Sequence, residues 1–509
     1  MRSEVIINLR KKLFILLLMI SLFVPCWNGA AQENNSQENS AMRRLEEQRR
    51  DTMRFGTETE IAALIQTLRS EKVSYLDEEL ISVAQKTRNR SILTEVFGFF
   101  GEMEKAGLED RAIRAVVDRV DEANDTVIAA VNYLGQLKVA KAVDCLEELI
   151  LSGENRFLSS AFRAIGLASA GYAEPRHVEE SVNAGVLQNS LESDDENAEE
   201  NTAIDEAGVE SVAVLNDRIA LFLLDHYKNR NPGDESRREI IVSIGETGSK
   251  EAVSFLSGLI KNPDERPVLR MAALDAISKI GDEEGLDAVI ESVNSSDPNV
   301  RSTAVGALGP FSGDAVDNAI LEAFRDSYYR TRIGAALAAG KRGMVSAIPF
   351  LRFRAENDDV PAVKDEAIKA LGVINNEETM GILDTLFTER KNSDRVRILT
   401  AEMLLRNNAE KYGPRVFMEM DEAKKKNQIP LYNGFVRAMG TAKAPSLESI
   451  ARQFISGGGV VERSLALDLV SLNEFRSLEE DVRTLLDEKK SGASIARKAK
   501  STLERLGLD

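Results

Sequence analysis

The sequence predicts an all-α protein, a right-handed superhelix of about ten to twelve stacked helical hairpins. Short segments whose ends both carry helix signals return along most of the 509 residues. Aromatic residues make up only 6% of the chain, whereas aliphatic residues and Ala are plentiful. This composition fits helices packed through Leu, Ile, Val and Ala, and not sheets, which favour β-branched and aromatic residues. The length exceeds what one compact core serves, which leaves several domains or one repeat array.

Residues 297 to 309 give the clearest copy of the unit. Asp297 is a good N-cap, because its carboxylate can accept the free N–H groups of the first turn. Pro298 suits the first helical position, where no N–H is needed. We expect Gly309 to end the helix in the left-handed conformation that glycine adopts cheaply. One apolar stripe runs along the helix, and its members are Val300, Ala304 and Leu308.

The repeat appears when glycines that are expected to end a helix are aligned. Their separations are 28 to 37 residues, apart from larger gaps after Gly166 and Gly372. The aligned glycines are Gly98, Gly135, Gly166, Gly245, Gly281, Gly309, Gly340, Gly372 and Gly440. Alanine stands five residues earlier in several copies, at Ala130, Ala161, Ala304, Ala335 and Ala367. Each unit is therefore expected to be a helix, a glycine turn and a second helix, and stacked units share one core.

Three stretches carry a resemblance to a known family: residues 297–309, Thr331–Gly340 and Val363–Gly372. They resemble HEAT repeats, and look most like the short HEAT-like repeats named after phycobilisome lyases. The resemblance is strong over residues 237–390 and fair over 125–170. It implies an α-solenoid and little chemistry, because the matching residues belong to the scaffold and none of them would handle a bilin.

The first 31 residues are expected to be a signal peptide that exports the chain, most simply to the periplasm. Four basic residues precede an apolar run from Leu13 to Val24, which is too short to span a bilayer comfortably. Gly29 and Ala30 lead to an expected cleavage after Ala31. Two alternatives are a retained anchor and a lipoprotein acylated at Cys26, for which Pro25 is a poor match.

The rest of the chain is expected to divide into four parts. A polar linker over 32–50 passes into a charged helix near its end, and repeats follow over 51–178. Residues 179–212 are an acidic insert with almost nothing to bury, so disorder is expected there. No Lys or Arg stands between Arg176 and Arg218, whereas twelve acidic residues do. A longer repeat block covers 213–509.

Chemistry is hard to place in this sequence. The chain has two histidines, His177 and His226, which we expect at the surface or at helix ends, and it lacks the motif spacings of metal sites. We expect no catalytic residue and no cofactor. Cys145, the one cysteine of the mature chain, is expected to be a small buried hydrophobe. The net charge of −18 disfavours nucleic acid and anionic membranes as partners.

One segment departs from the acidic background. Residues 325 to 355 contain seven basic residues and a single acid, Asp326. Arginine beside tyrosine is typical of binding hot spots. The candidate binding residues are Arg325, Tyr328, Tyr329, Arg330, Arg332, Arg342, Arg352 and Arg354. They form either solvated helix faces, with Arg332 as an ordinary repeat arginine, or an anion-binding patch for an acidic partner protein or for the chain's own residues 192–210.

The expected function is that of an exported, non-enzymatic scaffold or adaptor, which binds a protein partner along the curved surface of a solenoid. Two alternatives stay open. One is an enzyme or lyase-like subunit with a site of Arg and Glu side chains in the concave groove. The other is a nucleic-acid binder of the HEAT-like type, which the export signal and the net charge disfavour.

Overall fold

The computed structural model describes residues 42–170, 212–230 and 232–508. Within these residues the chain forms helices and turns and contains no β-strand. The expected signal peptide, the start of the linker and nearly all of the acidic insert lie outside them. The chain divides into two compact units, Met1–Glu251 and Ala252–Asp509, and each is described here by itself.

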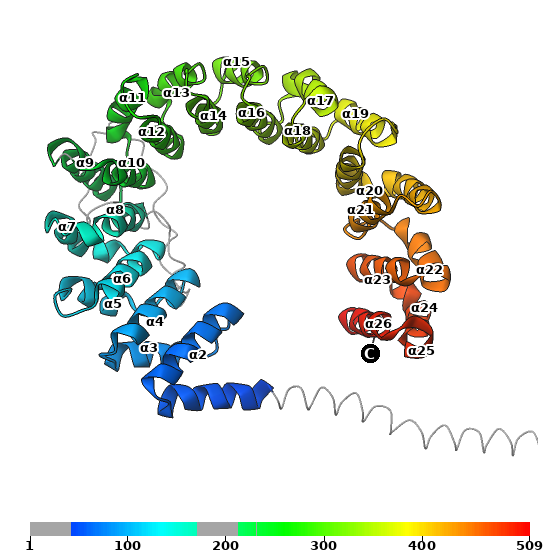
Figure 1. The fold of residues 1–509 in the computed structure, drawn as a ribbon, viewed down its shortest axis with the longest axis horizontal. Coiled ribbons are helices and arrows are strands. Elements are labelled where there is room, and N and C mark those ends of the chain that lie inside the picture. The colour runs from blue at the N-terminus through cyan, green and yellow to red at the C-terminus, as the bar shows by residue number, and fades with distance from the viewer. Residues whose placement is uncertain (1–41, 171–211, 231, 509) are drawn as a thin grey trace, which may run out of the picture. The chain divides into compact units, whose positions relative to one another are not determined.

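The first unit is a stack of short helices. Residues 42–55 are helical and precede the numbered elements. The α-helices that follow are α2 (Glu58–Glu71), α3 (Asp77–Lys86), α4 (Arg90–Glu102), α5 (Glu109–Val117), α6 (Asn124–Gln136), α7 (Val143–Leu151), α8 (Asn155–Ala170), α9 (Val212–Asn229) and α10 (Asp234–Thr247). Even-numbered helices pack on one another in one layer, and odd-numbered helices cover them (Figure 1).

The second unit continues the same pattern. Its first α-helices are α11 (Val253–Lys261), α12 (Pro267–Ile280), α13 (Leu286–Ser292), α14 (Pro298–Ala307), α15 (Asp314–Ala323), α16 (Tyr329–Lys341), α17 (Ile348–Asn357), α18 (Pro361–Ile374) and α19 (Glu377–Thr388). The remaining ones are α20 (Asp394–Lys425), α21 (Ile429–Met439), α22 (Leu447–Gly457), α23 (Val460–Asn473), α24 (Glu479–Arg483), α25 (Glu488–Ser491) and α26 (Ala493–Leu506).

Short 3₁₀ helices connect several of these elements. They are η1 (Ala140–Ala142), η3 (Lys250–Ala252), η4 (Glu283–Gly285), η5 (Val345–Ala347), η6 (Arg476–Leu478) and η7 (Thr484–Leu486). Most of them lead directly into the second helix of a hairpin, as η5 leads into α17. The all-α class and the stacking of helical hairpins are thus confirmed.

Two layers organise the second unit. Helices α12, α14, α16 and α18 lie side by side in one layer, which the first part of α20 continues; we call it layer A (Figure 1). The other layer, layer B, contains α11, α13, α15, α17 and α19. A layer-A helix is covered by its two neighbours in the layer and by layer B, so only one of its faces is left for solvent.

Helix α14 confirms most of what residues 297–309 predicted. The Asp297 carboxylate accepts hydrogen bonds from the backbone N–H groups of Asn299 (2.8 Å) and Val300 (3.2 Å), and Pro298 holds the first helical position. Val300, Ala304 and Leu308 are fully buried. The prediction for Gly309 was wrong: the helix ends at Ala307, and Gly309 is not left-handed.

Gly281 ends α12 in the left-handed conformation, as predicted, whereas several other aligned glycines act in packing, which corrects the predicted helix–glycine turn–helix unit at those positions. Gly340 lies inside α16, where an added Cβ would stand 2.9 Å from the Cα of Ala370 on α18. Gly135, Gly166 and Gly372 meet Ala164, Ser243 and Met403 in the same way. Because these residues have no side chain, consecutive helices of one layer can approach closely. The alanine column serves the same contact, since Ala130, Ala161, Ala304, Ala335 and Ala367 are all fully buried.

In four of the nine copies the left-handed residue stands three positions after the aligned glycine. Gly343 follows Gly340 with φ of 64°, and Asn375 follows Gly372 with φ of 49°. In the first unit, Lys138 follows Gly135 with φ of 50°. Asn and Gly adopt this region more readily than Lys does, so Lys138 gives no residue-type signal for its turn.

Candidate functional site

The eight candidate residues lie on two layers of the second unit. Arg325 lies between α15 and α16, and Tyr328 is the N-cap residue of α16. Tyr329, Arg330 and Arg332 belong to α16, and Arg342 follows its last residue. Arg352 and Arg354 belong to α17 in layer B. The structure therefore divides the predicted patch between the two layers.

Arg332 is a buried structural residue. Its guanidinium donates two hydrogen bonds of 2.8 Å to the carboxylate of Asp358, whose side chain is fully buried. It also donates to the backbone carbonyls of Asp326 and Ser327, which precede its own helix. Burial by itself would raise the pKa of Asp358, but the hydrogen bonds from Arg332 and from the Val360 N–H hold that pKa below its usual range.

The same arrangement occurs one repeat earlier. Arg301 of α14 donates to the carboxylate of Asp326 at 2.7 and 3.0 Å, and to the carbonyls of Ser295 and Ser296 ahead of its own helix. Each arginine thus ties the start of its own helix to the start of the next layer-A helix. This supports the interpretation of Arg332 as a repeat residue.

Most of the other candidate cations have an acidic partner just outside the basic segment. Arg342 donates to Asp317 at 2.9 Å and to the carbonyl of Phe311 at 2.6 Å. The remaining pairs are Arg325 with Glu322, Arg352 with Glu356 and Arg354 with Asp358. These ion pairs within the protein therefore neutralise most of the positive charge of the segment. The binding role of these residues stays a prediction.

Tyr328, Tyr329 and Arg330 form a cluster at the start of α16. The two tyrosine rings meet edge to face with centroids 5.4 Å apart. The Arg330 guanidinium lies over the Tyr329 ring and donates to its hydroxyl at 3.2 Å, and Tyr328 bonds Asn299 at the start of α14. Arg330 is exposed, and no carboxylate of the described residues pairs with it. This cation is available to a partner.

Layer A also carries exposed apolar residues on α16 and on α18. Leu337, two turns after Arg330 on α16, is 43% exposed, and Val373 on the adjacent α18 is 61% exposed. Gly306 on α14 is exposed and has open space where a Cβ would stand. We call five residues the layer-A face: the exposed Gly306, Arg330, Leu337 and Val373, and the partly exposed Tyr329.

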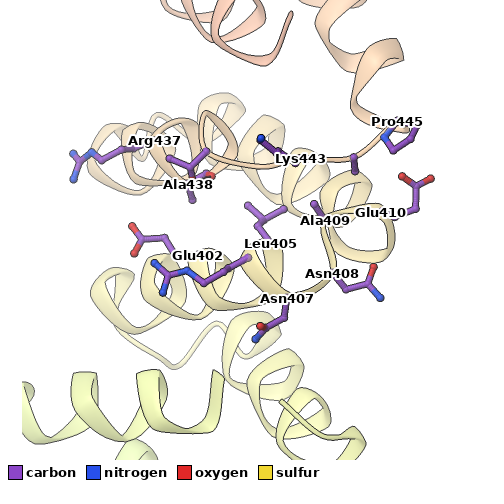
Figure 2. A pocket seen from close by; sticks show the side chains of 13 residues that line it. Glu402, Leu405, Asn407, Asn408, Ala409, Glu410, Arg437, Ala438, Lys443 and Pro445 are labelled. Atoms are coloured by element: carbon purple, nitrogen blue, oxygen red, sulfur yellow. Dashed lines mark hydrogen bonds between the residues drawn. The ribbon is translucent and has the colours of Figure 1, made fainter. Parts of the chain in front are cut away.

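A second candidate site, which the sequence did not suggest, lies between α20 and α21 (Figure 2). It is a pocket of about 820 Å³. Its wall includes three cations, Arg406, Arg437 and Lys443, and the acid Glu402. None of the four has an ion-pair partner within the described chain. This sets the pocket apart from the predicted patch, where all the arginines but Arg330 are paired.

Helix α20 is bent where it lines the pocket. Asn408 leaves the helical region with φ of −155° and ψ of 76°, and Pro414 follows in the next turns. The Asn408 side chain accepts from the N–H of Lys411 and caps the second part of the helix, as N-cap residues do. The repeat that ends at Arg406 also lacks the aligned glycine, and this absence was the available signal in the sequence.

Hydrogen bonds hold the walls of this pocket in place. Asn473 accepts from the N–H of Ala444 at 2.8 Å and donates to the carbonyl of Ala442 at 3.0 Å. Glu410 accepts from the N–H of Ser446, and Asn407 donates to the carbonyl of Gly372 at 2.7 Å. The loop after α21 and the bend of α20 are therefore fixed by partners other than the four ionisable side chains.

Other chemically reactive groups are few in the described part of the chain. No cluster of His, Cys, Asp and Glu there is arranged to hold a metal ion. Cys145 is half-buried, and burial raises the pKa of its thiol to about 11. His226 lies in the last turn of α9, at a helix end as expected, but it is buried against the Phe162 ring and not at the surface. Burial, with Arg230 nearby, lowers its pKa. His177 lies outside the described residues.

Hydropathy gives one further fact about the helices. No helix within residues 42–170, 212–230 and 232–508 is both long enough and apolar enough to cross a membrane.

The comparisons with solved structures return karyopherin Kap121p. Kap121p bound to Pho4p has 11% identity and a TM-score of 0.43, over 90% of this chain and 52% of that one. Kap121p alone gives 10% identity and a TM-score of 0.43, over 90% and 53%. Kap121p bound to RanGTP has 11% sequence identity and a TM-score of 0.40, over 90% of this chain and 52% of that one. The chain thus spans about half the length of these proteins.

No curated protein matches the sequence. A family model does: the one described as "Spirochaete HEAT repeat protein" matches residues 53–502, from the helix before α2 to the last turns of α26. The match includes all the repeats described above. This chain belongs to the spirochaete HEAT repeat protein family.

Proposed function

We propose that this protein is an exported, non-enzymatic scaffold that binds a protein partner through the layer-A face. The observation that carries the proposal is the exposure of Arg330, Leu337 and Val373 on adjacent helices of one layer. Repeat solenoids use such continuous surfaces to hold extended partners. The stacked HEAT-like hairpins give these side chains a rigid frame.

The chemistry of the layer-A face suits a protein partner. Tyrosine and arginine contribute large contact areas and directional hydrogen bonds, and they are enriched among residues that dominate binding energy. Leu337 and Val373 offer apolar area that a partner could remove from water, at about 25 cal/mol for each Å². Gly306 leaves room for a partner's side chain between the two helices that flank it.

Export is part of the proposal and depends on residues 1–31, whose basic start, short apolar run and Gly29-Ala30-Ala31 end are typical of a cleaved signal. The alternative of an enzyme would place a reacting group in the pocket between α20 and α21. Of its four unpaired ionisable groups, Arg406, Arg437 and Lys443 are exposed. Such exposed side chains are suited to holding an anion, whereas a catalytic group commonly lies buried in a cleft.

The test is chemical crosslinking of the full-length exported protein in envelope extract of the source cells, with quantification of the recovered partner. Arg330→Glu with Leu337→Asp changes the layer-A face. Lys391→Glu with Val345→Asp makes the same kinds of change on exposed residues outside the candidate set, after α19 and in η5, and serves as the matched control. We expect a loss of at least tenfold in recovery with the first variant and wild-type recovery with the second. Equal recovery with both variants, or equal loss with both, would contradict the proposal.

A further inference from the structure

The pocket between α20 and α21 has an unusual balance of charge for this acidic chain. Its lining contains the cations Arg406, Arg437 and Lys443 and the acids Glu402 and Glu410. The Glu410 carboxylate is engaged with the backbone N–H of Ser446. The lining therefore has one positive charge in excess, and its cations lack partners of their own within the described chain.

From this we infer that the pocket binds a single carboxylate carried by an acidic segment of a protein. The inference rests on the proposed function in that the ligand is part of a protein partner, and it adds the chemistry that this partner must present. A guanidinium group offers parallel N–H donors that match the two oxygens of a carboxylate, and Arg406 and Arg437 supply two such groups.

The remaining lining residues favour a carboxylate over a phosphate group. Glu402 faces the pocket from α20 opposite Arg437 of α21 (Figure 2), and its negative charge opposes a dianion more than a monoanion. Leu405, Ala438 and Pro445 add apolar surface beside the cations. An acidic residue flanked by aliphatic residues would therefore fill both parts of the site.

Preorganisation strengthens this inference. The loop that carries Lys443 is fixed by Asn473, and the bend that carries Arg406 is capped by Asn408. A ligand would then not have to order the walls, which is one of the main costs of binding. It would also not have to displace an internal carboxylate, because none in the described part of the chain pairs with the three cations.

The test is fluorescence anisotropy with a dye-labelled, C-terminally amidated peptide that contains the sequence Leu-Glu-Leu. The full-length protein is titrated at low salt. The double variant Arg406→Gln with Arg437→Gln removes both guanidinium groups, and Thr441→Trp fills the pocket from an exposed position of its lining. Arg497→Gln on α26 is the matched control, because Arg497 is exposed and, among the described residues, its side chain donates one hydrogen bond, to the carbonyl of Ala493.

We expect the double variant and Thr441→Trp to weaken peptide binding at least tenfold, or about 1.4 kcal/mol, and Arg497→Gln to leave it unchanged. A Leu-Gln-Leu peptide should bind as weakly as the variants do. The inference is overturned if wild-type protein does not bind the peptide, if all three variants bind alike, or if inorganic phosphate displaces the peptide at lower concentration than acetate does. A peptide with a free C-terminus and no Glu tests whether a terminal carboxylate serves as well.

Failure of this inference and failure of the proposed function give different results. If the Leu-Glu-Leu peptide does not bind the pocket while recovery of the crosslinked partner still depends on Arg330 and Leu337, only the pocket inference fails. If the peptide binds the pocket but the layer-A face variant recovers partner as the wild type does, the proposed face fails alone. Circular dichroism melts of each variant check that the fold is retained.

Discussion

The guanidinium of Arg332 and the carboxylate of Asp358 form a two-pronged ion pair with both hydrogen bonds at 2.8 Å, across consecutive repeats. The Asp358 side chain is completely shielded from solvent and that of Arg332 is 7% exposed. Asp358 also accepts from the N–H of Val360 at the start of α18. The pair therefore joins α16 to the beginning of the next layer-A helix.

Removal of one partner should be costly. Arg332→Met leaves the Asp358 carboxylate buried with weaker help from Arg354, and we expect the free energy of unfolding of the second unit to fall by about 3 kcal/mol. Arg352→Met removes the exposed pair with Glu356 and should cost less than about 1 kcal/mol. Urea denaturation followed by circular dichroism measures both changes. Similar losses for the two variants would show that the Arg332 pair is no more than a surface contact.

The same pair predicts a dependence on pH. The pKa of Asp358 is lower in the folded protein than in the unfolded chain, so its contribution is complete above the unfolded value of about 3.9 and is lost as the pH falls from there toward the folded value. Wild type should therefore exceed Asp358→Asn in stability by a constant amount from pH 7 to about pH 5, and the difference should shrink below about pH 4. Urea titrations of both proteins at each pH supply the difference. A gap that widens on acidification would contradict the assignment.

The packing role of the aligned glycines can be tested with a matched pair of alanine substitutions. Gly340→Ala places a methyl group 2.9 Å from the Cα of Ala370, so the helices must separate, and we expect a loss of about 1–3 kcal/mol. Gly306→Ala enters open space in a helix and should stabilise the protein by about 0.5–1 kcal/mol. Thermal and urea unfolding measure whether each substitution lowers or raises the free energy of unfolding. The account of the glycine column is wrong if Gly340→Ala stabilises as Gly306→Ala does.

Export predicts a defined start for the mature protein. N-terminal sequencing of the protein recovered from the envelope should begin at Gln32, and Ala31→Arg should slow cleavage, because a small residue is needed at that position. A start at Cys26 with an attached lipid would indicate the lipoprotein alternative. Recovery of the intact chain beginning at Met1 would indicate a retained anchor.

Much of the fold could be predicted from local signals. Asp297 and Pro298 marked the start of α14, and Ala304 marked a contact between repeats, because capping and packing act over a few residues. The role of Gly340 could not be read in this way. A glycine in a turn and a glycine against a neighbouring helix look alike in one sequence, and only the position of Ala370 on the next helix distinguishes them.

The candidate site was less predictable, since charge along the chain is a poor guide to charge in space. Arg332 and Arg354 both counted toward the basic segment, yet the sequence window stopped before Asp358, which binds them both. Conversely, Arg406 and Arg437 are 31 residues apart in the sequence, yet both line the pocket between α20 and α21. The run of basic residues at 325–355 therefore overstated the positive charge of that surface, and the sequence showed no sign of the cations that share the pocket between α20 and α21.

Site-specific photo-crosslinking tests the central claim, partner binding through the layer-A face, most directly. A benzophenone amino acid is placed at Leu337 of α16 in the full-length protein, and at the exposed Asp314 of α15 in layer B as the control. The account predicts a discrete crosslinked protein from position 337 that is absent from position 314 and is lost with Arg330→Glu. Crosslinking from position 314 alone, or none from position 337, would contradict it.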